Sequence, residues 1–494
     1  MNVASVLQEL RTLITSTQAV VTLESAEEER VDELLRGLAA ELGLPLFTWT
    51  ITRGLHRIDS PNAIYGTNDP MVLFRHLATL TTEGIFHLKD LAPHLTQPAP
   101  IRAFKEAAQA FGGRRAILVL TGDTVSLPEE LSLDAVPLRL PLPDRDDLKQ
   151  LLHSVVQSLG AQRKVEVTLG PDTLDAVLQA LSGLTLNQAR QALSLVVLND
   201  GKLSADELPQ LVKLKGEHIA DGGLLEFYPP GENAIELGGF ARLKAWLERE
   251  QVGFGAEAHA LGLRPPRGVL IVGVQGCGKS LAAKVIAQVW RQPLLKLDAG
   301  RLYDKYVGES EKNLRKALEV TEAIAPSVLW IDEIEKGFAS GGDADGGLSR
   351  RMLGSFLTWM QERQASVFVA ATANDLSAVP PEFLRKGRFD EIFFVDLPDA
   401  AEREAIFRIH LSQRRQDPGA FDVPALAAAC DGFSGAEIEQ AVVASLYRSL
   451  HDKTPLTSAL VLDELHQTVP LSVSRSEDID RLRMVARDRF VPVR

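Results

Sequence analysis

The fold of this chain is decided by the stretch Gly273-Val274-Gln275-Gly276-Cys277-Gly278-Lys279-Ser280. It follows the apolar run 269–272, which has the length and composition of a buried strand. Residues 281–290 after it have the apolar spacing of a helix. A Gly-x4-Gly-Lys-Ser pattern between a strand and a helix predicts a phosphate-binding loop in a parallel α/β sheet.

The residue types of this loop suit the phosphates of ATP. Glycines allow the backbone N–H groups and the start of the following helix to face an anion. Lys279 would neutralise the β- and γ-phosphates, and the Ser280 hydroxyl would bind Mg²⁺. The alternative is an ordinary glycine-rich turn, in which Lys279 and Ser280 have no role. We therefore expect nucleotide contacts from Gly273, Gln275, Gly276, Cys277, Gly278, Lys279, Ser280 and Leu281.

Two acidic residues, Asp332 and Glu333, end a later apolar run at 328–331. Charge buried at the end of a strand is unfavourable unless a partner compensates it. A Mg²⁺ ion and a water would do so, with Asp332 in the metal shell and Glu333 as the general base. A strand followed by a solvated acidic turn is the alternative for the pair taken alone.

Polar residues after the next apolar run extend this candidate site. Asn374 follows the run 367–371 and would reach the γ-phosphate or the attacking water, or would simply form a turn. Arg385 and Arg388 lie three residues apart around a glycine. They would stabilise the transition state of phosphoryl transfer, or they form a solvated surface.

Composition narrows the remaining functions. Of the 494 residues 45% are apolar and 24% charged, as in ordinary globular proteins, and the net charge is −13. This acidity disfavours a nucleic-acid motor, which needs a basic surface. No signal peptide, membrane span or disulfide framework is evident, so we expect a cytoplasmic protein. Cys277 inside the phosphate loop predicts an ATPase that is sensitive to oxidation.

The ordered set of motifs resembles the AAA family of ATPases over about residues 235–450. The resemblance implies nucleotide contacts from Gly238 in the entrance segment 237–239, from His410, and from the small residues Gly435 and Ala436. It implies that Arg385 and Arg388 act in trans on ATP held by the next subunit of a homo-oligomeric ring, usually a hexamer.

The resemblance also implies a pore loop formed by Lys305, Tyr306 and Val307, which would grip an extended polypeptide. The alternative is that Tyr306 packs on its own domain. We expect ATP hydrolysis coupled to the remodelling or regulation of an unidentified protein partner. An ATP-gated switch or scaffold without threading is the second class of function.

Short matches between the two halves of the chain recur in the same order about 250 residues apart. Examples are 142–144 with 397–399 and 183–185 with 432–434. The first copy lacks the phosphate loop, because Glu24, Glu27, Glu28 and Glu29 stand in its place. Only one acid, Asp90, follows the run 85–88, and no arginine lies at 130–136. A duplication with a degenerate first copy that does not hydrolyse ATP is therefore predicted.

The expected fold class is α/β, with tandem P-loop NTPase-like modules and a C-terminal helical lid. The expected parts are a degenerate module at 1–215, a linker at 216–234, an AAA large subdomain at 235–395, and a lid with further helices but no strand at 396–494. This arrangement resembles cyanobacterial and plastid AAA ATPases known as a hypothetical chloroplast reading frame. Segments 226–229, 357–362 and 469–472 carry that resemblance.

Overall fold

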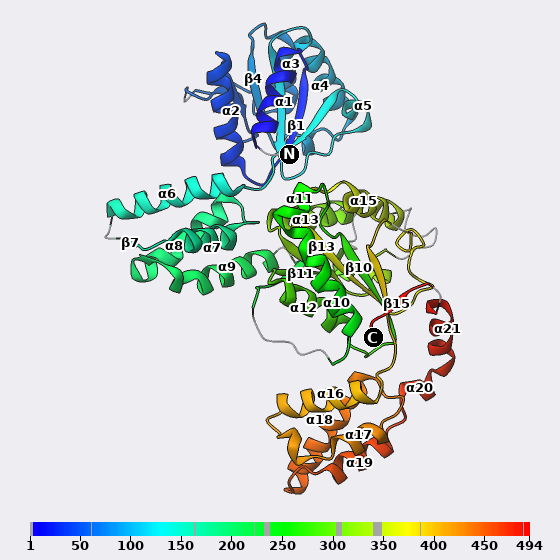
Figure 1. Cartoon of the computed structure of the whole chain (residues 1–494). Helices are drawn as coiled ribbons and strands as arrows, with labels where there is room; N and C mark the ends of the chain where they lie inside the picture. The colour runs from blue at the N-terminus through cyan, green and yellow to red at the C-terminus, as the bar shows by residue number, and fades with distance from the viewer. Residues whose placement is uncertain are drawn as a thin grey trace. The chain divides into compact units, whose positions relative to one another are not determined.

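The structure is a computed structural model that describes residues 3–60, 62–162, 165–221, 223–231, 238–302, 309–338, 348–385, 387–487 and 489–494. The chain divides into two units. The first unit contains Met1–Val167 and Leu184–Lys202, and the second contains Thr168–Gly183 and Leu203–Arg494. Each unit is built around one large sheet (Figure 1).

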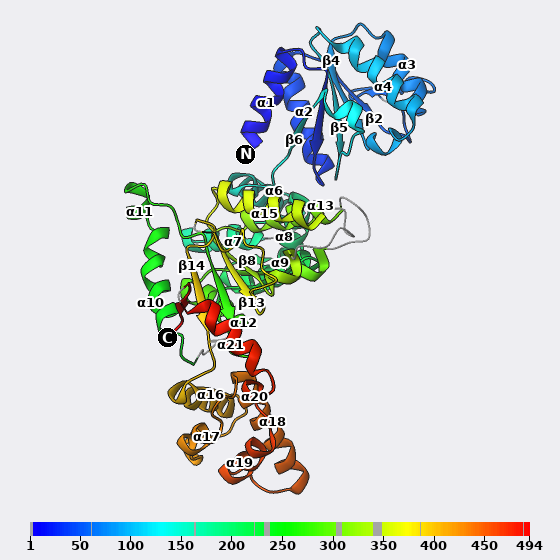
Figure 2. The same ribbon diagram turned by 90° about the vertical axis from the view of Figure 1, so that its right-hand side faces the viewer.

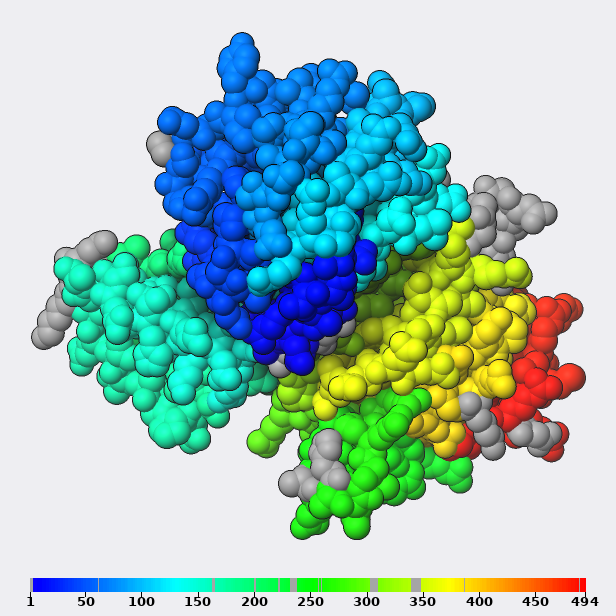
Figure 3. Space-filling view, turned by 90° about the horizontal axis from the view of Figure 1, so that it is seen from above, coloured from blue at the N-terminus to red at the C-terminus, as the bar shows by residue number. Residues whose placement is uncertain are grey.

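The sheet of the first unit has six strands in the order β3-β2-β4-β5-β1-β6. All neighbours are parallel except β3, which is antiparallel to β2. The strands are β1 Val20–Glu24, β2 Leu46–Trp49, β3 His56–Arg57, β4 Gly84–Lys89, β5 Ala116–Gly122 and β6 Ala135–Arg139. The helices are α1 Val3–Thr15, α2 Glu28–Leu42, α3 Pro70–Thr79, α4 Pro98–Phe111, α5 Glu129–Ser132, α6 Arg145–Gln162 and α8 Leu186–Asp200. In Figure 3 this sheet and helices α1 to α5, blue to cyan, form one continuous surface.

The sheet of the second unit has seven strands in the order β15-β14-β10-β13-β12-β11-β9. Only β9 is antiparallel to its neighbour. The strands are β9 Leu225–Tyr228, β10 Gly268–Gly273, β11 Leu294–Leu297, β12 Ser327–Ile331, β13 Val367–Ala373, β14 Glu391–Val395 and β15 Val491–Pro492. The helices before the lid are α7 Pro171–Leu181, α9 Leu208–Asp221, α10 Ala241–Glu250, α11 Ala256–Ala260, α12 Lys279–Trp290, α13 Glu309–Ala323, α14 Ile334–Phe338 and α15 Leu348–Glu362.

The two sheets share one strand order. The parallel strands run β2-β4-β5-β1-β6 in the first unit and β11-β12-β13-β10-β14 in the second. Taken in chain order, each strand of the first sheet therefore occupies the place of its counterpart in the second. This agreement confirms the predicted tandem of P-loop-like α/β modules.

Both sheets are covered by helices on two faces, because successive side chains of a strand point to opposite sides. In the first unit Val21 and Leu23 pack with α1 and α2, whereas Val20 packs with α3 and α4. In the second unit Leu270 packs with α13 and α15, whereas Val269 packs with α10 and α12. Strands buried on both faces explain the continuous apolar runs in the sequence.

A helical lid follows β14 in the second unit. It contains α16 Ala400–Gln413, α17 Val423–Ala429, α18 Gly435–Asp452 and α19 Ser458–Gln467, which share an apolar core around Phe407 and Leu426. Aspartate, serine or threonine caps the first turn of each of these helices.

The last residues depart from the expectation of helices alone. In Figure 2 the chain passes from the lid through α20 (Leu471–Ser474) and α21 (Ser476–Ala486) back to the sheet. There β15 pairs with β14 through Phe393–Val491 and Phe394–Pro492. The prediction of no strand after residue 396 is thus wrong, because a two-residue edge strand that contains proline has no pattern of its own.

The stretch expected as a linker also contains regular structure. Residue 215 lies within α9, and β9 pairs with β11 at the edge of the second sheet. The turn-forming residues 229–231 follow this strand rather than replacing it.

Among the described residues no helix is long and apolar enough to cross a membrane.

Candidate active site

The loop between β10 and α12 has the conformation that its glycines predict. At Gly273 a Cβ would lie 2.0 Å from the Val395 carbonyl oxygen, so a side chain cannot fit. Gly276 adopts a positive φ of 76°, which favours glycine. The loop closes on Lys279, whose Nζ donates to the carbonyl oxygens of Gly273 (2.9 Å) and Val274 (2.8 Å). Burial lowers the pKa of Lys279 to about 8, so the ammonium remains charged at neutral pH.

The residues predicted to hold Mg²⁺ meet at the carboxyl ends of β10 and β12. The Ser280 hydroxyl donates to Asp332 Oδ1 at 3.1 Å. Thr372 of β13 donates to the same oxygen at 2.5 Å. A hydroxyl and a carboxylate are hard oxygen ligands, and Mg²⁺ commonly takes few protein ligands beside phosphate and water. The donor set therefore fits Mg²⁺.

Glu333 and Asn374 also lie together. The Asn374 amide Nδ2 donates to Glu333 Oε1 at 2.7 Å, and Lys336 forms an ion pair with the other carboxylate oxygen. Glu333 has a positive φ of 51°, and its backbone N–H donates to the Thr372 hydroxyl at 3.0 Å. Thr372 thus holds the backbone that aims Glu333 while it also orients Asp332.

Three residues of this cluster were missed by the sequence reasoning: Thr372, Glu335 and Lys336. Glu335 Oε1 accepts the backbone N–H of Asn374 at 2.9 Å, and burial raises the pKa of this carboxyl. Signals in the sequence could have found two of them, Thr372 and Glu335. Thr372 is the one polar residue of the strand 367–373, and Glu335 is a third acid two residues after Glu333.

The two arginines differ in their surroundings. Arg388 donates from Nη1 to the Leu357 carbonyl oxygen at 2.9 Å. Arg385 is exposed and lines a wide cavity together with Gly273, Gln275 and Asn374. Its side chain forms no hydrogen bond or ion pair with the residues that the structure describes. Arg385 is therefore the freer of the two guanidinium groups.

The lid contacts the phosphate loop through the start of α18. The Ala436 N–H donates to the Gly276 carbonyl oxygen at 3.0 Å, and the same oxygen is 3.3 Å from the position of a Cβ on Gly435. Gly238 packs in the same way against Ile406 of α16. The structure thus brings Gly435 and Ala436 to the loop, whereas Gly238 packs against the lid. That these residues contact a nucleotide stays a prediction.

The other predicted residues have different surroundings or lie outside the described part of the chain. Leu281 is 42% exposed in the first turn of α12. His410 Nδ1 lies 3.8 Å from a carboxylate oxygen of Glu439 on α18, and burial lowers its pKa. Lys305, Tyr306 and Val307 lie outside the described residues.

Cys277 is buried in the loop, and this burial opposes the expected sensitivity to oxidation. Burial raises the pKa of its thiol to about 12, and that of Cys430 in the lid to about 11. Oxidation and alkylation proceed through the thiolate. The Cys277 thiol therefore stays protonated near neutral pH, which disfavours both reactions.

We accordingly expect the folded chain to resist thiol reagents. With the aromatic disulfide DTNB at pH 8, neither cysteine should react in the time in which both react in guanidinium chloride. Release of one equivalent of the chromophore from the folded chain, lost in Cys277→Ser, would show instead that the loop thiol is accessible.

The corresponding place in the first unit is filled by charged side chains of the chain itself. Lys89 ends β4 level with Thr121 of β5, as Asp332 lies beside Thr372. Its Nζ donates to Glu28 (2.8 Å) at the start of α2 and to Asp32 (2.7 Å). Burial alone would lower the pKa of Lys89, but these two hydrogen bonds outweigh it and raise the pKa.

Compared with the second unit, the positive and the negative side chain have changed places. A cation ends the third parallel strand where the second unit has an aspartate, and an acid begins the helix where it has Lys279. The connection from β1 to α2 is also short, only residues 25–27. These facts agree with the predicted loss of nucleotide chemistry in the first module.

Comparisons with protein families match three segments of the chain. Residues 269–397 match the ATPase family associated with various cellular activities (AAA). Residues 6–140 match the N-terminal domain of SpoVK-like AAA ATPases, and residues 146–222 match their second domain. The chain belongs to the AAA family of ATPases and hydrolyses ATP.

Similar proteins extend the match to almost the whole chain. The AAA domain-containing protein ycf46 of Guillardia theta is 33% identical over 97% of this chain and 94% of its own length. The ycf46 protein of Pyropia yezoensis is 32% identical over 97% of both chains. That of Trieres chinensis is 34% identical over 94% of this chain and 93% of its own. The expected resemblance to hypothetical chloroplast reading frame AAA proteins is thereby confirmed.

Proposed function

We propose that the second unit hydrolyses ATP with Mg²⁺ in a homo-oligomeric ring, a hexamer as the family resemblance implies, and that hydrolysis drives the remodelling of a protein partner. The observation that supports the chemistry is the pair formed by Glu333 and Asn374 at 2.7 Å. Glu333 directly follows Asp332, whose carboxylate accepts a hydrogen bond from the Ser280 hydroxyl at 3.1 Å. A base and a metal ligand are thus adjacent at the end of one strand.

Each residue has a separate role in this proposal. Lys279 and the loop N–H groups bind the phosphates, and Ser280 and Asp332 hold Mg²⁺, which neutralises phosphate charge when bound. Glu333 accepts a proton from the attacking water, and Asn374 orients the Glu333 carboxylate. Thr372 and Glu335 fix the backbone of Glu333 and Asn374 through the hydrogen bonds described above.

The arginines are proposed to act on the site of a neighbouring subunit. Arg385 supports this role because it is exposed and makes no side-chain bond among the described residues. Arg388, bonded to Leu357, would position the loop that carries Arg385. A guanidinium group supplied in this way is worth about 10³–10⁵ in rate.

A mixing experiment tests this arrangement. Arg385→Ala and Lys279→Ala chains should each be inactive, and equal mixing should restore part of the ATPase activity. Recovery is expected because an intact loop in one subunit can meet an intact arginine in its neighbour. A mixture of Arg385→Ala and Arg388→Ala chains is the control. Both variants are altered in the same arginine loop, so they should not rescue each other. If mixed oligomers verified by mass spectrometry show no recovery, the arginines do not act in trans.

A further inference from the structure

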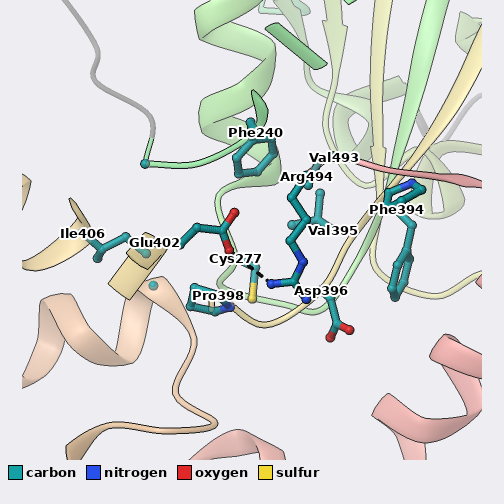
Figure 4. Close-up of a pocket in the computed structure, with 13 residues that line it drawn as sticks. Phe240, Cys277, Phe394, Val395, Asp396, Pro398, Glu402, Ile406, Val493 and Arg494 are labelled. Carbon is teal, nitrogen blue, oxygen red and sulfur yellow. Dashed lines mark hydrogen bonds and ion pairs between the residues drawn. The ribbon is translucent and has the colours of Figure 1, made fainter. Parts of the chain in front are cut away.

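A small cavity lies where the lid, the phosphate loop and the last residues of the chain meet (Figure 4). Its volume is about 100 Å³. Cys277 of the loop, Ile406 of α16 and Gly435 of α18 line it. Residues 492–494, which follow α21, form another part of its wall. A segment far from the loop in the sequence thus reaches the site.

Backbone hydrogen bonds hold this last segment in place. The Val493 N–H donates to the Phe394 carbonyl oxygen at 3.1 Å, and the Val493 carbonyl oxygen accepts from Arg242 N–H of α10 at 2.9 Å. Val493 itself is 4% exposed. The segment therefore joins the edge of the sheet to the first helix of the AAA module.

The Arg494 side chain continues from this anchor to the start of the lid. Its Nη1 donates to the Leu397 carbonyl oxygen and to Glu402 Oε2, both at 3.4 Å, and Asp399 lies at 3.7 Å. A dashed line in Figure 4 joins its guanidinium group to the Glu402 carboxylate. Leu397 and Asp399 belong to the connection between β14 and α16, so Arg494 ties the lid to the sheet beside the cavity.

Glu402 is central to the same corner. It accepts the Asp399 N–H at 3.0 Å in a capping box that begins α16. A Cβ on Gly239 would lie only 2.2 Å from Glu402 Oε1, so the entrance segment packs directly on this carboxylate. Arg494 therefore fixes a group against which the entrance segment and the lid both rest.

The orientation of the phosphates assigns this cavity to the other end of the nucleotide. Phosphates at the start of α12 leave Mg²⁺ on the side of Ser280 and Asp332. The nucleoside part of the bound nucleotide then extends past Cys277, which lines the cavity. This step rests on the proposed function.

We propose that Arg494 is a positioning residue for the nucleoside end of ATP, and that it acts by holding Glu402 and the connection to the lid around this cavity. Loss of Arg494 loosens the wall against which the nucleoside packs. The hydrogen bonds and ion pairs of Arg494 go to Leu397, Glu402 and Asp399, so the phosphate loop keeps its own ligands.

Two ligands separate this role from a general effect on the site. ADP carries the nucleoside, whereas inorganic tripolyphosphate carries only phosphates. For Arg494→Ala in the whole chain, the Kd of ADP should rise about threefold, on the scale of a half-exposed ion pair. For Arg494→Glu it should rise about tenfold or more, because like charges then face each other. The Kd of tripolyphosphate should not change, and Arg494→Lys should restore part of the ADP affinity.

A double-mutant cycle tests the route through Glu402. Glu402→Gln keeps a residue that can complete the capping box but removes the ion pair. The double variant should bind ADP no more weakly than either single variant, since both remove one interaction. Arg487→Ala is the matched control, because Arg487 is exposed directly after α21 and does not line the cavity.

The outcomes distinguish this proposal from the proposed function. A wild-type chain that binds neither ligand overturns the proposed function. A wild-type chain that binds ADP no more tightly than tripolyphosphate overturns the present proposal alone. Equal losses of both ligands in Arg494→Ala, unchanged ADP binding in Arg494→Glu, or additive losses in the double variant also overturn it.

Discussion

Lys279→Ala is expected to lose nucleotide binding, with the affinity for ADP and ATP falling by about 100-fold or more, since two charge-assisted hydrogen bonds of about 1.5–3 kcal/mol each are removed. The Lys279 ammonium is already buried at the loop, where it bonds two carbonyl oxygens. A phosphate would replace these neutral acceptors with charged ones. Isothermal titration of the whole chain with ADP measures the loss directly.

Lys316→Ala is the control for this variant. Lys316 is exposed on α13, away from the loop, and its removal takes away the same charge. Its ADP affinity should equal that of the wild type. If Lys279→Ala binds ADP as tightly as Lys316→Ala, while both unfold at the wild-type temperature, the phosphate site is assigned to the wrong loop.

Glu333→Gln is expected to bind ATP normally but to hydrolyse it about 10²–10⁴-fold more slowly, the usual contribution of a general base. Glutamine keeps an oxygen that can accept the Asn374 amide, so the geometry of the pair is retained. It cannot take a proton from water, and it loses the ion pair with Lys336. Single-turnover hydrolysis, measured beside ATP affinity, separates the chemical step from binding.

Glu362→Gln, exposed at the end of α15, provides the matched control and should turn over ATP like the wild type. Rapid turnover by Glu333→Gln would remove Glu333 from the role of base. The same variant should hold ATP for long enough to retain a protein partner. Proteins that are captured by Glu333→Gln in the presence of ATP, but not by Lys279→Ala, are the candidates for the remodelled partner.

The phosphate loop could be predicted because its chemistry lies in consecutive residues. Strand, loop, lysine and helix all occur within residues 268–290, so no knowledge of the tertiary fold was needed. Asp332 and Glu333 were predictable for the same reason, since both end one apolar strand. The duplication was indicated as well, through matches between the halves of the chain, but the strand order was not.

The other residues of the site depend on how segments far apart in the sequence pair in the fold. Thr372 reaches Asp332 only because β12 and β13 pair with Ile331 beside Ala371. Glu335 reaches Asn374 only because α14 turns back beside the end of β13. The position of Arg494 depends on a two-residue strand that pairs with β14. None of these pairings has a local pattern.

The ion pairs of the first unit set it apart from the second unit in how its charges are balanced. Under the proposed function, Lys279 and Asp332 of the second unit bind the triphosphate and the metal, so their surroundings would change with every turnover. In the first unit Glu28, Asp32 and Lys89 satisfy one another within the chain. At this place, the first module therefore balances its charges without any ligand, whatever occupies the second.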